Sequence, residues 1–401
     1  MADARDGGSI DARLAAAGLP PLPRRAWLEI DEQALAGNLA LARELAGAGV
    51  ELNAVVKADA YGHGLVSVAR VFERAGADRL CVASLDEALV LRRAGISAPI
   101  LVLFAIPPAE AVAAARQRIE IVAAERTSTL ATLAAWQAGS AGGAQLSVHL
   151  EIETGLSRGG FQPSQAGAMA HRIGALSGVK LAGIWSHLAT PDDEDVTAAQ
   201  VDAFERAVDA VRATGIDVPA RHLGATGGLY TGRAPAYEGV RVGLALYGLL
   251  PDDLPLSARA TDAAAGLRPA LALKCLPLRI ETLAAGTPVG YGGRWVTERE
   301  SRIATLPIGY GDGWARASSP VAGALVRGRR VALVGTVAMD ALMADVTDVP
   351  EVGMEDEFVL IGEQEGARIT ADEVAGERRT INYEVTTALR ERLPRVHFGG
   401  G

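Results

Sequence analysis

The chain has 401 residues, of which 49% are hydrophobic and 22% charged, and its formal net charge is −9. This composition is typical of a folded globular protein and excludes a disordered one, and the length predicts a large domain with a smaller second one. Because acidic and basic residues are interspersed, no basic surface is available to neutralise a phosphate backbone, so we expect no nucleic-acid partner.

The two cysteines, Cys81 and Cys275, are far apart in the sequence and each has apolar neighbours. We therefore predict reduced core residues, not a disulfide, and no metal site. The N-terminal segment lacks the apolar run of a signal peptide, and no later run approaches the length of a membrane span. These features favour a cytoplasmic protein without a membrane partner.

The first 25 residues contain a helical pattern, "SIDARLAAAG", followed by the proline-rich "LPPLPRR". We interpret residues 1–25 as a flexible N-terminal arm without catalytic residues. A candidate strand follows at 26–31, and we expect it to pair with a later β domain. Asp31 is placed to cap a helix that begins at Glu32.

From there to residue 262, short apolar runs alternate with helical patterns, one of which carries a capping box from Ser84 to Glu87. About eight strand–helix units fit in this stretch, which predicts an α/β fold, a (β/α)₈ TIM barrel over 26–262. After residue 263, strand-like runs are separated by Gly and Pro turns. This change predicts a C-terminal, mostly-β domain over 263–398.

Polar residues stand at or near the ends of several predicted barrel strands, where the working face of such a barrel lies. They are Lys57, Arg158, His187, Thr226 and Arg241. Each residue alone is more often a solvated or structural side chain, but their convergence on one barrel mouth favours a site. The glycine-rich stretches around Thr226 and Arg241 follow the last two strands, where such barrels usually bind phosphate.

Lys57 ends the apolar run "NAVV" and precedes the tight turn "AYGHG". A desolvated lysine beside a phosphate pocket suits pyridoxal phosphate chemistry, because burial near other cations favours the uncharged amine that forms an imine. The β domain adds three tyrosines in or near turns, Tyr291, Tyr310 and Tyr383, out of seven in the chain.

With these motifs in order, the sequence resembles the alanine racemase family, fold type III pyridoxal phosphate enzymes with a barrel and a β domain. The resemblance covers residues 26–396. The motifs that carry it are "AVVKADAYGHG", "VRVGLALYG", "TPVGYGGRW", "RIATLPIGYGDGW", "GTVAMDALMADVTD" and "TINYEV".

The resemblance implies interconversion of L- and D-alanine by two bases, supply of D-alanine for peptidoglycan, and a homodimer with shared sites. Lys57 would hold pyridoxal 5'-phosphate and act as one base, and Tyr291 of the partner subunit would be the other. The implied cofactor-binding residues are Tyr61, Arg158, His187, Thr226, Arg241, Gly243, Leu244 and Tyr383. Arg158, Met339 and Tyr310 would meet the substrate, and Asp340 would support the site. A cationic network of Arg241 and His187 would favour the phenolate of Tyr291.

Two stretches depart from the common pattern of the family. Glu151 stands where many members carry a carbamylated lysine, and we hypothesise that its carboxylate pairs directly with Arg158. The "GATGG" loop leaves Thr226 as its only hydroxyl. Three alternatives remain open: a racemase of serine or of a broader set of amino acids, a fold type III amino-acid decarboxylase, and a non-catalytic pyridoxal phosphate carrier.

Overall fold

The computed structural model describes residues 8–139, 143–218, 220–319 and 322–399. The first seven residues of the predicted arm lie outside the described residues. The chain divides into two compact units. One comprises 35–60 and 65–268, and the other comprises 1–34, 61–64 and 269–401. Each unit is considered by itself.

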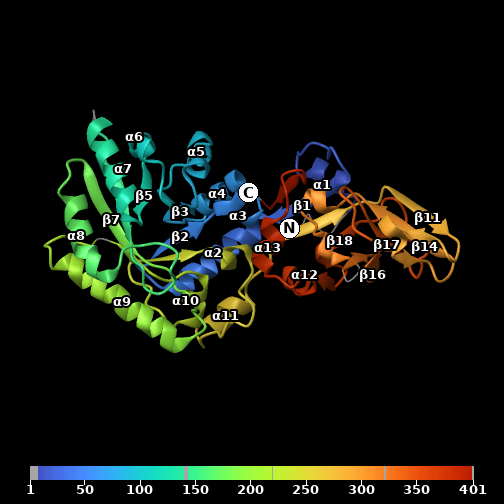
Figure 1. Ribbon diagram of the computed structural model, residues 1–401. Helices are drawn as coiled ribbons and strands as arrows, with labels where there is room; N and C mark the ends of the chain where they lie inside the picture. Colours follow the sequence, from blue (N-terminus) through green and yellow to red (C-terminus); the bar gives the residue numbers. More distant parts are fainter. Residues whose placement is uncertain (1–7, 140–142, 219, 320–321, 400–401) are drawn as a thin grey trace. The chain divides into compact units, whose positions relative to one another are not determined.

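The first unit is a barrel of eight parallel strands (Figure 1). Its strands, in spatial order, are β8 (Arg221–His222), β7 (Val179–Trp185), β6 (Leu146–Glu151), β5 (Ile119–Ala123), β4 (Ile100–Val102), β3 (Arg79–Val82), β2 (Glu51–Val55) and β9 (Gly239–Val242). The barrel closes just past β8, where the amide of Arg241 donates to the carbonyl of Gly224 at 2.9 Å. The predicted barrel and its strand count are confirmed.

Helices follow the barrel strands in the expected alternation. They are α2 (Glu32–Ala46), α3 (Lys57–Tyr61), α4 (Leu65–Arg74), α5 (Leu85–Arg93), α6 (Ala111–Arg116), α7 (Arg126–Gly139), α8 (Pro163–Gly174), α9 (Glu194–Arg212), α10 (Thr226–Thr231) and α11 (Ala260–Ala265), with 3₁₀ turns η1 (Pro108–Glu110) and η2 (Leu244–Tyr247). Two sequence predictions about helix starts are confirmed. Asp31 accepts the Ala34 amide at 3.0 Å, and the capping box of Ser84 and Glu87 is formed.

The second unit is built on an antiparallel-rich sheet, as the turn pattern predicted. Its strands run in the order β11 (Arg279–Leu283), β14 (Ser301–Leu306), β17 (Leu342–Asp345), β16 (Arg329–Val334), β15 (Gly323–Val326), β18 (Phe358–Gln364), β10 (Leu271–Cys275), β1 (Ala26–Asp31) and β20 (Arg395–Phe398). β19 (Ala367–Ile369) pairs with β18, and β12 (Pro288–Val289) pairs with β13 (Trp295–Val296).

Short helices and 3₁₀ turns complete this unit: α1 (Ile10–Ala16), η3 (Tyr291–Gly293), η4 (Tyr310–Asp312), η5 (Arg316–Ser318), α12 (Ala371–Arg378) and α13 (Asn382–Thr387). The N-terminal strand β1 is the last but one strand of its sheet, next to the edge strand β20. It pairs antiparallel with β10 and parallel with β20. β1 therefore belongs to the β sheet although it precedes the barrel in sequence.

Helix α1 is tied to this sheet by a buried group of charges. Arg13 lies 2.8 Å from Glu29 and 2.5 Å from Glu357, and Lys274 lies 2.9 Å from Glu29. Burial acts to raise the pKa of Glu29, but Lys274 and Arg13 outweigh it and hold that pKa below its usual value. The apolar residues Ile10 and Leu14 share a core cluster with Trp27. Flexibility of the arm as a whole stays a prediction.

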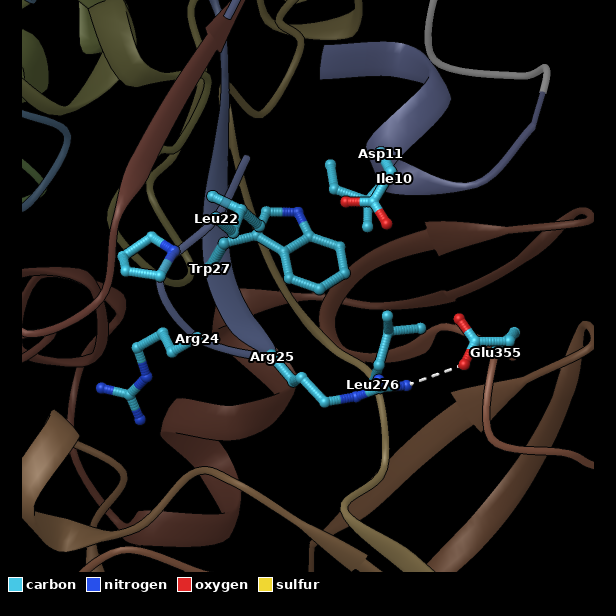
Figure 2. Close-up of a pocket in the computed structure, with 9 residues that line it drawn as sticks. Ile10, Asp11, Leu22, Arg24, Arg25, Trp27, Leu276 and Glu355 are labelled. Carbon is cyan, nitrogen blue, oxygen red and sulfur yellow. Dashed lines mark hydrogen bonds and ion pairs between the residues drawn. The ribbon is translucent and has the colours of Figure 1, made fainter. Parts of the chain in front are cut away.

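A hollow of about 270 Å³ lies beside α1 and β1 (Figure 2). Trp27, Leu22 and Ile10 form apolar parts of its wall, and an ion pair of Arg25 with Glu355 stands at 3.3 Å. None of the site residues predicted from the sequence lines this hollow. It is therefore a feature of the arm and not of the predicted site.

Replacing Arg13 by Ala is expected to destabilise this unit by about 3 kcal/mol, because it leaves the buried carboxylate of Glu29 and the partly buried one of Glu357 with only Lys274 to compensate them. Equilibrium unfolding in urea measures the loss. Arg299→Ala is the matched control, because its ion pair with Asp348 is exposed to solvent, which screens it, and should contribute much less to stability. Equal losses in the two variants would show that the Arg13 cluster adds no particular stability.

Both cysteines are buried and free, as predicted. Burial raises the pKa of the Cys81 thiol to about 12, so it is protonated at neutral pH. No helix in the described part of the chain is both long enough and apolar enough to span a bilayer. Within the same described residues, no group of His, Cys, Asp or Glu is arranged to hold a metal ion.

Candidate functional site

Lys57 opens a turn of left-handed backbone just past the end of β2. Four consecutive residues without glycine, Ala58 to Tyr61, have φ between 53° and 54°. Each such residue costs roughly 1–2 kcal/mol, so a left-handed turn of this length persists only where its surroundings fix it. The turn is a strained support for the lysine.

Hydrogen bonds to both ends fix this turn. The carboxylate of Glu87 accepts the Ala58 amide at 2.7 Å, and that of Asp59 accepts the Leu65 amide at 2.7 Å. The other oxygen of Glu87 accepts the Ala83 amide at 2.8 Å and, as part of the α5 capping box, the Ser84 amide at 3.3 Å. Glu87 therefore joins the N-terminus of α5 to the lysine turn. The sequence revealed only its capping role.

The environment of Lys57 lowers the pKa of its amine. Burial is the largest cause, and the cations Arg158 and Arg241 add to it, whereas Glu87 and Cys81 oppose it. A lowered pKa increases the fraction of uncharged, nucleophilic amine at neutral pH. The prediction that Lys57 is a desolvated lysine beside other cations is supported by these contacts.

Glu87→Gln is expected to lower the pKa of Lys57 further, because it removes a negative charge that raises it. The variant also loses an acceptor for at least one amide, which should cost about 1 kcal/mol of stability. The pH dependence of Lys57 acetylation by limiting acetic anhydride, read by peptide mass spectrometry, measures the shift. Asp86→Asn is the control, because it removes a charge from the same helix turn; an equal shift there would exclude a specific role for Glu87.

Arg241, in β9, is buried, and acceptors surround both of its Nη atoms. Its Nη1 donates to the ring Nδ1 of His222 at 2.8 Å and to the carbonyl of His222 at 2.6 Å. Its Nη2 donates to the carbonyls of Ser186 at 2.6 Å and Leu223 at 3.1 Å, and approaches Nδ1 of His187 at 3.3 Å. Burial lowers the pKa of Arg241 to about 10, so the guanidinium remains charged at neutral pH.

His187 is neutral, which corrects the expected cationic pair of Arg241 and His187. Burial lowers the pKa of His187 to about 3, and the nearby charges of Arg241, Arg158 and Lys57 lower it in the same direction. Because a guanidinium only donates hydrogen bonds, Nδ1 of His187 must accept and its proton lies on Nε2. Arg241 is the cation of this pair, and His187 is a neutral hydrogen-bond donor.

The loops after β8 and β9 are joined through a threonine hydroxyl. Thr226 Oγ1 accepts the amide of Gly243 at 3.2 Å and that of Ala245 at 3.5 Å. The predicted residues Thr226, Gly243 and Leu244 are thus brought together. A side chain at Gly227 would place its Cβ 2.5 Å from Pro191, so this loop requires glycine there.

Glu151 does not form the expected direct pair with Arg158. Between these two described residues there is neither an ion pair within 4.0 Å nor a hydrogen bond, and the Arg158 guanidinium lies over the ring of Phe104, 5.7 Å from its centroid. Burial raises the pKa of Glu151 to about 7, although Arg158 and Arg241 oppose this shift. Without a directly paired cation, burial has the larger effect, so the Glu151 carboxyl is partly protonated at neutral pH.

In the second unit, Tyr61 and Tyr383 form a pair of rings whose centroids are 6.1 Å apart. Burial raises the pKa of Tyr383 to about 12, so its phenol is protonated at neutral pH. The chain turns closely at Gly62, where a Cβ would lie 2.1 Å from the carbonyl oxygen of Thr386. His63 is buried with Nδ1 3.0 Å from the Tyr61 carbonyl, a structural position.

Tyr291 stands on a turn that is tightly fixed at its base. Gly290 has φ +75°, and a Cβ there would lie 2.8 Å from the end of Met343. The hydroxyl of Thr336 donates to the Tyr291 carbonyl at 3.1 Å. The Tyr291 side chain itself is 70% exposed in the single chain. This turn presents a phenol outward on a rigid backbone.

Backbone hydrogen bonds join the loops that carry Tyr310 and Met339. The Tyr310 amide donates to the Ala338 carbonyl at 3.1 Å, and the Gly311 amide donates to the Met339 carbonyl at 2.8 Å. Asp340, predicted to support the site, forms an ion pair with Arg392 at 2.6 Å. Tyr310 and Met339 are thus neighbours within this unit.

Models of two protein families match most of the chain. The N-terminal domain of alanine racemase matches residues 30–251, and the C-terminal domain of alanine racemase matches residues 270–397. The chain belongs to the alanine racemase family. The resemblance inferred from the sequence motifs is therefore confirmed over both units.

Full-length relatives agree with this assignment. The chain is 39% identical to the alanine racemase of Symbiobacterium thermophilum over 94% of its length and 98% of the relative. It is 36% identical to that of Halothermothrix orenii over 94% and 97% of the two chains. The solved alanine racemase of Bacillus anthracis, with bound L-Ala-P, has a TM-score of 0.84 at 33% identity and covers 95% of this chain and 97% of that one. A solved alanine racemase of Clostridium difficile 630 has a TM-score of 0.87 at 29% identity, with 94% and 97% covered.

Proposed function

We propose that this protein is a pyridoxal 5'-phosphate-dependent racemase that interconverts L- and D-alanine. The observation that carries the proposal is that Lys57, at the barrel mouth of this member of the alanine racemase family, has a pKa lowered by burial and by Arg158 and Arg241. The same reaction would supply D-alanine for peptidoglycan in the cytoplasm. The small-molecule partner is thus an amino acid.

The residues present fit the proposed cofactor. Lys57 offers an amine whose lowered pKa favours the uncharged form that attacks an aldehyde, and the Thr226 hydroxyl with the Gly243 and Leu244 loop offers a phosphate site. Tyr61 and Tyr383 are proposed to complete the phosphate contacts, and Arg158 to contact the ring oxygen. The cofactor, when bound, supplies the electron sink for breaking the bond to the α-hydrogen.

Arg241 is proposed to donate a hydrogen bond to the ring nitrogen of the cofactor. A guanidinium with a pKa of about 10 remains protonated and does not hand over its proton near neutral pH. The negative charge that develops on the substrate is then less delocalised than beside a protonated ring. This arrangement favours return of the proton at the α-carbon and disfavours transamination.

Two bases are needed, because racemisation removes the α-proton on one face and returns a proton on the other. We assign Lys57 to one face and Tyr291 to the other. The exposed phenol of Tyr291 supports its delivery to a second subunit, and so a homodimer with shared sites. Arg158 and the Met339 amide are proposed to hold the substrate carboxylate. Tyr310 would line the access channel.

Glu151→Gln tests whether the buried carboxyl tunes Arg158. Because the pKa of Glu151 is about 7, we expect wild-type kcat/KM for alanine to contain an ionisation near that pH. Below it the variant should match wild type, since glutamine resembles the protonated acid. Above it the variant should diverge, since only wild type gains a negative charge near Arg158. Identical pH profiles would remove Glu151 from the proposal.

The experiment that tests the function is a racemisation screen of the purified holoenzyme against L-amino acids, read by chiral chromatography. Formation of D-alanine supports the proposal, whereas preferred conversion of serine or of larger residues supports the broader racemase. Carbon dioxide released in proportion to substrate consumed would support a decarboxylase. A protein that binds the cofactor and turns over none of these substrates is the carrier.

A further inference from the structure

The interior of this barrel contains a polar layer. Barrels of this type are usually filled with branched apolar residues, and burying charged groups costs free energy unless each is paired. Here the strands β2, β3, β5, β6, β8 and β9 contribute Asn53, Arg79, Glu120, His149, His222 and Arg241, all of them buried except Glu120, whose side chain is partly buried. Hydrophobic packing therefore does not explain why these polar residues occupy the barrel interior.

Hydrogen bonds connect these residues in one continuous chain. Arg79 Nε lies 2.8 Å from Glu120 Oε2, which lies 2.9 Å from His149 Nε2. His149 Nδ1 lies 3.0 Å from His222 Nε2, and His222 Nδ1 lies 2.8 Å from Arg241 Nη1. A continuous series of hydrogen bonds therefore connects Glu120 with Arg241 of the candidate site.

The direction of every bond in this chain follows from its two ends. Arg241 only donates, so His222 must accept at Nδ1 and carry its proton on Nε2. That proton points to Nδ1 of His149, which must accept, so His149 carries its proton on Nε2. This second proton meets Glu120, an acceptor that also receives the Nε–H of Arg79. Arg241 thus requires the neutral Nε2–H tautomer of both histidines, and the acceptor at Glu120 agrees with it.

The charged groups around the two rings are consistent with neutral histidines. Burial lowers the pKa of His149, and the charge of Arg79 lowers it further. Glu120 and Glu51 act to raise this pKa but do not outweigh burial. Burial also lowers the pKa of His222 well below its usual value, and Arg241, His149 and Arg79 act in the same direction. Glu120 keeps a carboxylate, with its pKa lowered to about 2 because His149 and Arg79 outweigh burial.

The packing around the chain is specific to it. A Cβ at Gly183 would lie 2.6 Å from Nδ1 of His149, so this position in β7 leaves room for the imidazole. The indole of Trp185 stacks on His222 at an angle of 6°, and the Arg241 guanidinium lies 4.7 Å from the centroid of a Trp185 ring. β7 thus holds both rings and the guanidinium in place.

We propose that Glu120 is a positioning residue for Arg241, acting through His149 and His222. Its carboxylate accepts the last proton of the chain and thereby leaves a bare ring nitrogen of His222 for the guanidinium. This series of hydrogen bonds cannot relay protons, because it ends at an arginine, and a guanidinium has no atom that accepts a proton. The proposal rests on the proposed function only for the role of Arg241; the hydrogen-bond chain stands without it.

The first test is the tautomer of each ring in the wild-type holoenzyme labelled with ¹⁵N-histidine. Long-range ¹H–¹⁵N spectra distinguish a protonated from a bare ring nitrogen, and deleting one histidine at a time assigns the signals. We expect His149 and His222 to carry hydrogen on Nε2 only, without change between about pH 6 and about pH 9, where an ordinary histidine titrates. A proton on Nδ1 of either ring, or a charged ring at neutral pH, overturns the proposal.

The second test removes the acceptor. Glu120→Leu should alter the His149 signals and also those of His222, one ring further away, and should lower kcat roughly tenfold with KM for alanine unchanged. Glu120→Gln, which keeps a carbonyl oxygen, should restore both. Glu51→Gln is the matched control, because it removes the other carboxylate of Arg79 and none of the hydrogen bonds of the two histidines.

Unchanged His222 signals and kcat in Glu120→Leu would overturn the positioning role, as would equal effects in Glu51→Gln. If Glu120→Leu does not fold, Glu120→Asp, whose carboxylate is withdrawn by one carbon, replaces it with the same expected direction. The spectra can be recorded without turnover. If the protein proves to have no racemase activity, the proposed function is contradicted, but the spectra still test the hydrogen bonds from Glu120 to Arg241.

Discussion

Tyr291→Phe is expected to lower racemisation in both directions by roughly 10²–10⁴-fold, because it removes one of the two proposed bases. The turn that presents Tyr291 depends on the glycine at 290 and on the Thr336 hydroxyl, which donates to the carbonyl of residue 291, and phenylalanine preserves both. Stability and cofactor binding should therefore be unchanged. The loss should fall on kcat, with KM for alanine little changed.

The Tyr291→Phe variant should still remove and return the α-proton on the face that Lys57 serves. With Lys57 still present, the α-hydrogen of one alanine enantiomer should exchange with solvent deuterium, whereas the other enantiomer should exchange slowly. Mass spectrometry of recovered alanine measures both. Tyr230→Phe is the matched control, because its buried hydroxyl has no hydrogen-bond partner in the structure and its removal should leave activity unaltered. Undiminished racemisation in Tyr291→Phe would exclude Tyr291 as a base.

The alternation of strands and helices was predictable from the sequence because barrel strands are short apolar runs separated by amphipathic helices. Local chemistry also revealed the caps at Asp31 and Ser84, since capping depends on residues three positions apart. The ends of parallel strands share a face, so the convergence of Lys57, Arg158 and Arg241 could be inferred before any coordinates.

Other features depend on partners distant in sequence. The left-handed turn from Ala58 to Tyr61 contradicts the ordinary preference of its residues, and its support from Glu87 comes from another helix. A strand pattern shows which side chains face inward but not which of them bond. The polar layer around His149 and His222 was therefore not predicted, nor was the neutrality of His187, which follows from burial.

Lys57→Ala is expected to abolish racemisation to below about 10⁻³ of wild type, because it removes both the covalent attachment of the cofactor and the second base. The barrel should remain folded. The amine is partly desolvated, which is unfavourable for its charged form, and the turn after it is fixed by backbone amides that donate to the carboxylates of Glu87 and Asp59, which alanine at position 57 leaves in place. Urea unfolding should show a stability equal to wild type or higher.

The decisive measurement is again isotope exchange, in the presence of added cofactor. If Tyr291 serves the face opposite Lys57, Lys57→Ala should exchange the α-hydrogen of the enantiomer that Tyr291→Phe cannot exchange, at a low rate. Lys57→Arg keeps the positive charge beside Arg158 but cannot serve as a base at neutral pH, so it should behave like Lys57→Ala. Exchange of the same enantiomer in the Lys57 and Tyr291 variants would mean that both residues act on one face, and the two-base assignment would fail.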